Sequence, residues 1–251
     1  MKAAALISLL VMTTVAPHAN AASSTEVFSA SQQLLVVTTP SAQATGGQLQ
    51  RYQRSGAKQP WLAVGKPVSI MVGRNGLAWG SGLLPPPQSS TIKREGDGRS
   101  PEGVFALGTS FGYAASALPG AGLPYLALSA STECVDDAQS RHYNRIVDRT
   151  AGADWNSSER MREMGEYYRW GVVVDHNHIA APDADAKPAA GGGSCIFLHV
   201  WKEAQPTSGC TAMAQPDIES LLLWLDPRKR PLLVQLTSEN YAALRRDWSL
   251  P

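Results

Sequence analysis

The chain has 251 residues, of which 22 are Lys or Arg and 21 are Asp or Glu, so its net charge is +1. This length is enough for one sizeable domain with its own hydrophobic core. The charges form no basic stripe and no run of like sign, which argues against binding to nucleic acid or to an acidic membrane surface.

The first 21 residues have the pattern of a secretory signal peptide. Lys2 precedes an apolar run that ends near Val15, and small residues follow at Ala19 and Ala21. The run is shorter than the roughly 20 residues that cross a bilayer, and later segments are interrupted by Gly, Pro or charge. We therefore expect cleavage after Ala21, a location in the periplasm or outside the cell, and no stable membrane insertion after cleavage.

Short β-type runs separated by Gly and Pro follow along the chain. The expected strands cover residues 33–39, 47–54, 67–73, 103–108, 125–129, 170–176, 195–200 and 232–237. Helices are expected over residues 157–170, over residues 215–227 with Pro216 near the first helical position, and from Ser238 onward. Because strands and helices do not alternate regularly, we expect a mainly β or α+β fold.

One histidine and one cysteine lie eleven residues apart in the segment FLHVWKEAQPTSGCTAM (197–213). His199 is expected at the end of a buried strand, and Cys210 after a turn that contains Pro206 and Gly209. An imidazole beside a thiol can take its proton and make the sulfur a nucleophile. At the side-chain-free Gly209 a substrate carbonyl can approach the backbone, where the N–H groups of Gly209 and Cys210 could receive an oxyanion.

Several segments, in this order, resemble the L,D-transpeptidases of the YkuD family. GSCIFLHVW and PTSGCTAM resemble its catalytic signature, in which a histidine precedes an S/T-x-G-C element, and KREGDGRSPEGVFALG resembles its EGD-x-R-T-P-x-G-x-F segment. GVVVDHN and WLDPRKRPLLVQL also fit such domains. The resemblance implies a YkuD-like β-sandwich of mixed sheets with a few short helices. The expected parts are a signal peptide (1–21), a β-rich extension (22–59), the catalytic domain (60–237) and a C-terminal helix (238–251).

The resemblance also implies an exported enzyme that acts on peptidoglycan stem peptides and so on cell-wall organisation and cell shape, without a metal or cofactor. Cys210 would form a thioester with a donor stem and release a terminal D-amino acid, and an acceptor amine would then form the cross-link. His199 would be the base and acid, the Val200 carbonyl would orient its imidazole, and Ser208 would be a polar neighbour of the sulfur. Water in place of the amine would give an L,D-carboxypeptidase or related wall hydrolase, and an inert Cys210 would leave a non-catalytic wall-binding protein.

The chain departs from the family pattern at three points. The spacing from histidine to cysteine is shorter than usual, Val200 stands where glycine is usual, and Ala212 stands where Arg or Asn is usual. These differences leave the donor and acceptor preference open.

The cysteines are Cys134, Cys195 and Cys210, and an exported chain can keep a disulfide. Pairing of Cys134 with Cys195 would leave Cys210 free, and closing that loop would contribute roughly 4 kcal/mol in the entropy model. The alternatives are three free thiols or a bridge to Cys210, and such a bridge would exclude Cys210 as the nucleophile.

Four further residues are candidates for binding substrate. Arg99, Arg141 and Tyr143 are candidates to grip a stem-peptide carboxylate, since guanidinium groups suit carboxylates. His176 is a candidate to line the mouth of the active site.

Three other patterns have simpler explanations. GTSFG (108–112) matches the G-x-S-x-G elbow of serine hydrolases, but Pro and Gly interrupt the helix that the elbow requires. DHNH (175–178) offers two histidines to a metal without a suitably spaced third ligand. Asp136 and Asp137 point to opposite sides if they lie on a strand, so turn capping or pairing with Arg141 is preferred to joint acid–base work.

Overall fold

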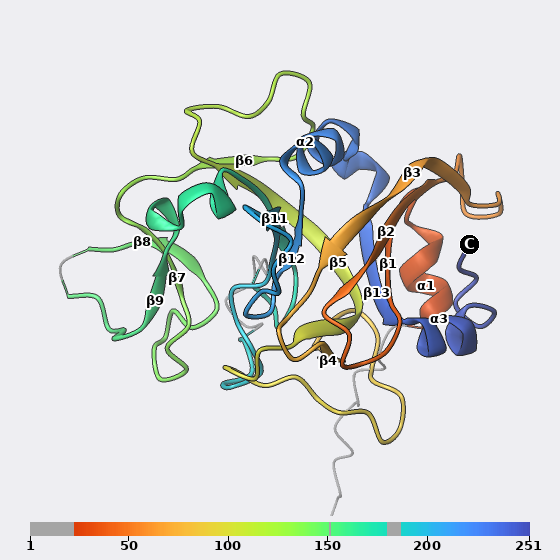
Figure 1. The fold of residues 1–251 in the computed structure, drawn as a ribbon, viewed down its shortest axis with the longest axis horizontal. Coiled ribbons are helices and arrows are strands. Elements are labelled where there is room, and N and C mark those ends of the chain that lie inside the picture. The colour runs from red at the N-terminus through yellow and green to blue at the C-terminus, as the bar shows by residue number, and fades with distance from the viewer. Residues whose placement is uncertain (1–22, 151, 180–186) are drawn as a thin grey trace, which may run out of the picture.

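The computed structural model describes residues 23–150, 152–179 and 187–251, so the expected signal peptide lies outside the described residues. One large sheet contains ten strands, with β6 (Tyr125–Ala127) beside β5. Its order is β10 (Trp170–Val174), β11 (Phe197–Val200), β12 (Thr211–Met213), β3 (Leu62–Met71), β2 (Gly46–Gln53), β1 (Gln33–Thr39), β13 (Leu232–Thr237), β5 (Ser100–Gly112) and β4 (Leu77–Trp79). The mainly β fold expected from the sequence is confirmed (Figure 1).

The large sheet closes on itself because the long strand β5 has two partners. Its residues 103–106 pair antiparallel with β13, and its residues 107–112 pair antiparallel with β10. Closure gives hydrogen-bond partners to strand edges that would otherwise be open. At Gly171 of β10 the closure is tight, since a Cβ there would lie 2.3 Å from a ring carbon of Phe111.

Residues on both sides of the expected boundary at 59/60 belong to this one sheet. β1 pairs parallel with β13, with Leu34 opposite Leu232, and it pairs antiparallel with β2 on its other side. Leu35 and Val37 of β1 pack in one hydrophobic cluster, and Leu34 and Val36 pack in another, because successive residues of a strand point to opposite faces of the sheet. The N-terminal strands therefore help to build the core of the domain.

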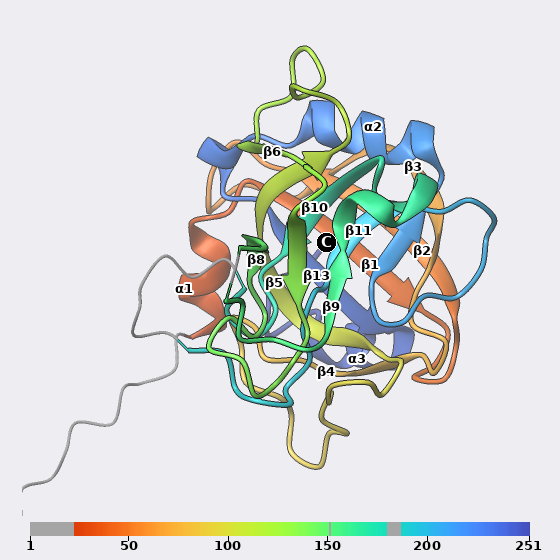
Figure 2. The same cartoon turned by 90° about the vertical axis from the view of Figure 1, so that its left-hand side faces the viewer.

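Helices cover both faces of the large sheet (Figures 1 and 2). α2 (Gln215–Trp224) lies against β10 and β11, while α1 (Ser24–Ser29) and α3 (Ser238–Leu244) lie on the other side, and α3 contacts β1 and β13. The helix expected from Ser238 to the end of the chain is α3, which ends at Leu244. A short 3-10 helix, η3 (Pro227–Lys229), precedes β13. In the described residues no helix combines the length and apolar character that crossing a membrane requires.

A small sheet with the order β8 (Ile146–Asp148), β7 (Thr132–Val135), β9 (Ser158–Arg160) stands beside β10 and β11 (Figure 1). The helix expected over residues 157–170 is wrong. This segment contains β9 and two 3-10 turns, η1 (Met161–Glu163) and η2 (Gly165–Tyr168). Gly165 has a left-handed backbone with φ 59°, which interrupts a continuous helix. Met161 and Tyr168 are still buried, so their spacing correctly indicated burial on one side.

Candidate active site

β11 and β12 bring the imidazole of His199 and the thiol of Cys210 to one cavity. The strands are parallel, with His199 opposite Ala212, and Cys210 directly precedes β12. Side chains two residues apart on an extended chain share a face, so Cys210 and Ala212 both face the side of His199. His199 and Cys210 both border a cavity of about 250 Å³.

The Cys210 thiol is buried and held by backbone groups. Sγ accepts a hydrogen bond from the Phe197 N–H at 3.3 Å and donates to the Cys195 carbonyl at 3.3 Å. Burial, together with the nearby negative charge of Glu159, raises the pKa of the Cys210 thiol well above its usual range. The resting side chain is therefore a neutral thiol.

The His199 imidazole is held in one tautomer by the backbone. Its Nδ1 lies 2.7 Å from the Val200 carbonyl oxygen. Because a carbonyl only accepts, Nδ1 carries the proton and Nε2 keeps its lone pair. Burial lowers the pKa of His199 to about 4, against the opposing effect of the bond to Val200. The imidazole is thus neutral at pH 7 and can accept a proton at Nε2.

Residues 207–209 shape the backbone before the sulfur. Thr207 Oγ1 donates to the Cys210 carbonyl at 2.6 Å and accepts from the Gly209 N–H at 3.0 Å. The Gly209 N–H is therefore engaged and does not stand free for an oxyanion, unlike the sequence-based expectation. Ser208 Oγ accepts a hydrogen bond from Arg74 Nη1 at 3.1 Å. The hydroxyl of Ser208 thus lies at the cavity wall beside Cys210.

Ser100 gives Cys210 a second support that sequence reasoning missed. Its fully buried Oγ donates to the Cys210 carbonyl at 2.9 Å and accepts from the Gly73 N–H at 2.9 Å. The only signal in the sequence was its place in the GDGRSPEG segment. The hydroxyl of Ser100 thus links strand β5 to the backbone of Cys210 by a hydrogen bond.

A second cavity of about 270 Å³ also borders Cys210. Acidic and basic side chains line it, namely Arg74, Lys93, Glu95, Asp136 and Glu159. Arg74, Glu159, Ser208 and Cys210 border both cavities. Arg74 and Glu159 were not among the residues expected from the sequence, because they lie far from the histidine and cysteine in the chain.

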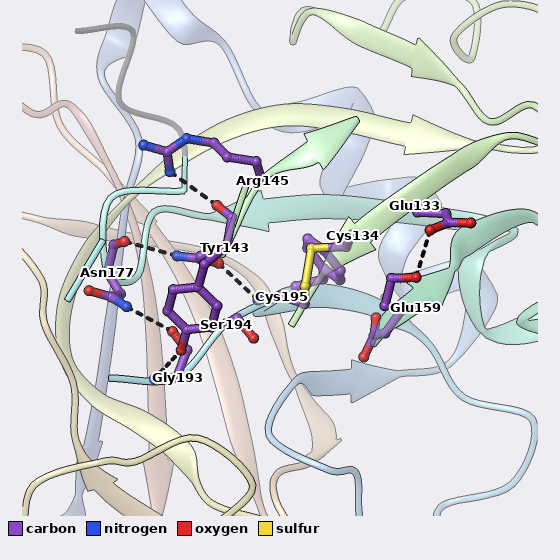
Figure 3. The surroundings of a disulfide bond; sticks show 12 residues. Glu133, Cys134, Tyr143, Arg145, Glu159, Asn177, Gly193, Ser194 and Cys195 are labelled. Atoms are coloured by element: carbon purple, nitrogen blue, oxygen red, sulfur yellow. Dashed lines mark hydrogen bonds between the residues drawn. A yellow bond between two sulfur atoms is a disulfide. The ribbon is translucent and has the colours of Figure 1, made fainter. Parts of the chain in front are cut away.

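Cys134 and Cys195 form the expected disulfide, and Cys210 is a free thiol (Figure 3). The two bridged residues have Cα atoms 6.0 Å apart and are separated by 61 residues in sequence. Cys134 lies on β7 of the small sheet, while the Cys195 carbonyl accepts the hydrogen bond of the Cys210 thiol. The disulfide therefore connects the small sheet to the backbone that holds the sulfur.

Two of the expected substrate-binding residues are buried within the fold. The Tyr143 hydroxyl donates to Glu95 Oε2 at 2.6 Å and accepts from the Gly193 N–H at 3.1 Å. His176 Nε2 lies 3.0 Å from the Gly192 carbonyl oxygen, and burial with the charge of Lys93 lowers its pKa to about 4. Neither side chain borders the two cavities at Cys210.

The two expected arginines also lie apart from these cavities. Arg141 has a side chain that is 75% exposed, and its Nε lies 3.4 Å from an Asp154 carboxylate oxygen. Arg99 Nη1 donates to the Leu77 carbonyl at 3.0 Å. The structure therefore brings together His199, Cys210 and Ser208, but not the four substrate-binding candidates.

The other patterns have structural explanations. Ser110 of the G-x-S-x-G match lies inside β5, and its Oγ donates to the Pro124 carbonyl at 2.9 Å, so no nucleophile elbow exists there. Asp137 accepts hydrogen bonds from two backbone N–H groups, as a turn-capping residue does. Within residues 23–150, 152–179 and 187–251, no three His, Cys, Asp or Glu side chains are gathered closely enough to hold a metal ion.

A closed β domain with a neutral imidazole and a neutral thiol at one cavity defines a candidate cysteine-dependent catalytic domain. The sequence profile of the L,D-transpeptidase catalytic domain (YkuD) matches residues 32–234, and the chain belongs to this family. The matched region begins just before β1 and so includes strands expected in an extension.

No curated protein matches the sequence. Among solved structures, the crystal structure of the helical cell shape determining protein Pgp2 from Campylobacter jejuni is similar, with 15% sequence identity and a TM-score of 0.38. The similarity covers 85% of this chain and 53% of that one, so the chain spans about half the length of the structural relative.

Proposed function

We propose that the protein is an exported L,D-transpeptidase that joins peptidoglycan stem peptides. Membership of the family supports the reaction class. The observation that carries the proposal is the pairing of β11 with β12, which puts His199 and Cys210 at one cavity while Val200 fixes the histidine tautomer. A periplasmic or extracellular location is part of the proposal and rests on the sequence pattern of residues 1–21.

The first half-reaction acylates the cysteine. Sγ of Cys210 attacks the carbonyl of the donor stem while its proton passes to Nε2 of His199. The imidazolium then gives this proton to the leaving D-amino acid, and a thioester remains on the sulfur. Since the thiol pKa is raised and the imidazole pKa is lowered, the proton moves during the attack and not before it.

The second half-reaction transfers the acyl group. The acceptor amine attacks the thioester carbonyl, His199 takes the amine proton, and the proton returns to the departing sulfur. An amide cross-link forms and Cys210 is again a neutral thiol. Water in place of the amine would give hydrolysis by the same residues.

The test is to incubate the mature protein with tetrapeptide muropeptides and to determine the products by mass spectrometry. Cross-linked dimers are expected from the wild type, and Cys210→Ala should form them about 10⁶-fold more slowly, as expected for loss of a nucleophile. Tripeptide monomers without dimers would contradict the transpeptidase and indicate a hydrolase. Equal product from Cys210→Ala would remove Cys210 from the mechanism.

A further inference from the structure

Glu159 lies at the site but has no part in the chemistry of the thiol and imidazole. Its side chain borders both cavities that contain Cys210. Glu159 belongs to β9, where it lies opposite Cys134 of the disulfide (Figure 3). The small sheet therefore presents a carboxylate to the place where substrate must bind.

Tyr168 holds one oxygen of this carboxylate. The Tyr168 hydroxyl donates to Glu159 Oε2. The tyrosine ring is buried and packs edge-on against Phe197 and His199, with ring centroids 5.5 Å away in both cases. The orientation of the carboxylate is thus tied to the strand that carries the catalytic histidine.

Glu159 has no cationic partner in the part of the chain that the structure describes. The ion pairs found there do not include it, and the neighbouring Lys93 is already paired with Asp97 at 2.9 Å. Burial, with the negative charges of Asp136 and Glu95, raises the pKa of Glu159 to about 7, although the bond from Tyr168 opposes the shift. The carboxylate therefore lies in a poorly hydrated position where its hydrogen bond comes from Tyr168, while the guanidinium of Arg74, on the walls of the same cavities, donates to Ser208.

Asp136 provides a second, independent sign of a missing donor. It borders the same second cavity, and its buried Oδ1 has no hydrogen-bond partner in the described structure. Buried charges and buried polar atoms are normally paired, because leaving them unpaired costs free energy. Among the described residues Glu159 thus has no ion-pair partner and Asp136 Oδ1 has no hydrogen-bond donor, and a cationic donor group of a bound substrate would serve both.

We propose that Glu159, oriented by Tyr168, binds the ammonium group of a stem peptide at Cys210. The inference rests on the proposed function, since amines of stem peptides are the cationic groups that this reaction brings to the sulfur. The ammonium has two possible sources, a side-chain amine of the donor stem and the amine of the acceptor, which would pass one proton to the Glu159 carboxylate before it attacks as the neutral amine. Asp136 lies on the wall of the same cavity and adds negative charge for either one.

The test uses the mature protein and Glu159→Gln, with two synthetic tetrapeptide stems as donors. One donor has L-lysine at the third position, and the other has Nε-acetyl-lysine there. In the donor arm, release of the terminal D-amino acid is followed without acceptor. In the acceptor arm, the acetylated donor is combined with a tripeptide acceptor that carries a free side-chain amine.

If the donor amine is bound, the wild-type KM should be about 10-fold lower for the free-amine donor than for the acetylated one, as one charged hydrogen bond provides. Glu159→Gln should erase this ratio and change kcat much less. If the acceptor amine is bound, the wild-type KM should be equal for the two donors in the donor arm. Glu159→Gln should then raise the acceptor KM about 10-fold. A Glu159→Gln enzyme with both KM values unchanged would overturn the proposal.

Two variants separate recognition from folding. Glu163→Gln removes a nearby carboxylate, whose side chain is 63% exposed. It should leave the ratio of the two donor KM values and the acceptor KM as in the wild type. Tyr168→Phe keeps the ring against His199 but removes the bond to Glu159, and it should weaken the amine preference partly. If Glu159→Gln does not fold by circular dichroism, Tyr168→Phe decides, and an undiminished preference there overturns the proposal.

The failure of this inference can be distinguished from failure of the proposed function. If the wild type releases no D-amino acid, the proposed function fails, and calorimetric binding of both tetrapeptides to Cys210→Ala then tests the ammonium site alone. Tighter binding of the free-amine peptide, lost in Cys210→Ala/Glu159→Gln, supports the site. Equal affinities in both proteins overturn it.

Discussion

In the large sheet, β1 and β13 bury apolar side chains on both faces, whereas the small sheet of β7, β8 and β9 is organised around polar groups. Glu133 of β7 is 3% exposed and accepts hydrogen bonds from Arg149 Nε, Trp155 Nε1 and Ser158 Oγ, all within 2.7 Å. The large sheet is stabilised in proportion to the apolar surface that it buries. The three short strands of the small sheet cannot bury enough apolar surface to be stable alone.

The small sheet compensates by attachment to its larger neighbour. The Cys134–Cys195 disulfide is one attachment (Figure 3). Buried Asn144 is another. The Asn144 side chain donates to the carbonyls of His176 and Asn177 and accepts from the Cys195 N–H at 3.0 Å. The large sheet thus supplies the thiol and imidazole, and the attached small sheet supplies the carboxylate of Glu159.

Removing the disulfide is expected to have the largest effect on this arrangement. Opening a loop of 61 residues should lower the free energy of unfolding by about 4 kcal/mol in the chain-entropy model. Cys134→Ala/Cys195→Ala should therefore show a clearly lower urea midpoint than the wild type. Activity should fall as well, because the bridge holds the Cys195 backbone, whose carbonyl accepts the hydrogen bond of the Cys210 thiol.

Cys210→Ala is the matched control, since it removes the third cysteine and leaves the disulfide in place. It should abolish activity while lowering stability much less than the double variant. A double variant within about 1 kcal/mol of the wild type would show that noncovalent contacts alone hold the small sheet.

The contrast between the sheets also explains what could be predicted from the sequence. β1 and β13 were predicted at residues 33–39 and 232–237 because they are long, apolar and β-branched. β7, β8 and β9 were missed because they have three or four residues and mixed polarity, so that an alternation of apolar and polar residues could not be recognised in them. Their existence depends on tertiary attachment, which local patterns do not encode.

The same distinction holds at the site. His199 and Cys210 could be proposed because one short segment carries both, with His199 on β11 and Cys210 directly before β12. Glu159 borders the cavities at Cys210 and Ser100 binds the Cys210 carbonyl only through pairings with partners distant in the chain, and neither residue type marked a site in the sequence. Arg141 and Tyr143 were chosen for their chemistry alone, and the fold gives them partners elsewhere.

Glu133→Gln should destabilise the small sheet by a smaller amount, about 2 kcal/mol at pH 7, because it weakens charge-assisted hydrogen bonds in a buried position. Burial alone would raise the pKa of Glu133, but the hydrogen bonds from Arg149, Ser158 and Trp155 lower it to about 2. A lowered pKa stabilises the folded state above the unfolded-state pKa of 4.5, and this contribution disappears as the pH falls toward 2.

The measurement is urea unfolding of both proteins between pH 7 and pH 2. The difference in unfolding free energy should be full above pH 5 and should shrink as the pH falls. Glu163→Gln, in an exposed pair with Arg160 at 3.7 Å, should change stability by less than about 0.5 kcal/mol. A difference between Glu133→Gln and wild type that does not vary with pH would contradict the role assigned to the charge.

Within the large sheet, Ser100→Ala should have the smallest effect on stability, about 1 kcal/mol, because it leaves the Gly73 N–H without its partner. Ser110→Ala on the same strand is a matched control, since Ser110 is also buried and its hydroxyl also donates to a backbone carbonyl, that of Pro124. Both variants should lose similar stability, but only Ser100→Ala should lower kcat, by several-fold, because of these two serines only Ser100 donates to the Cys210 carbonyl, which it supports together with Thr207. Equal loss of kcat in both would mean that the hydroxyl of Ser100 stabilises β5 without positioning the nucleophile.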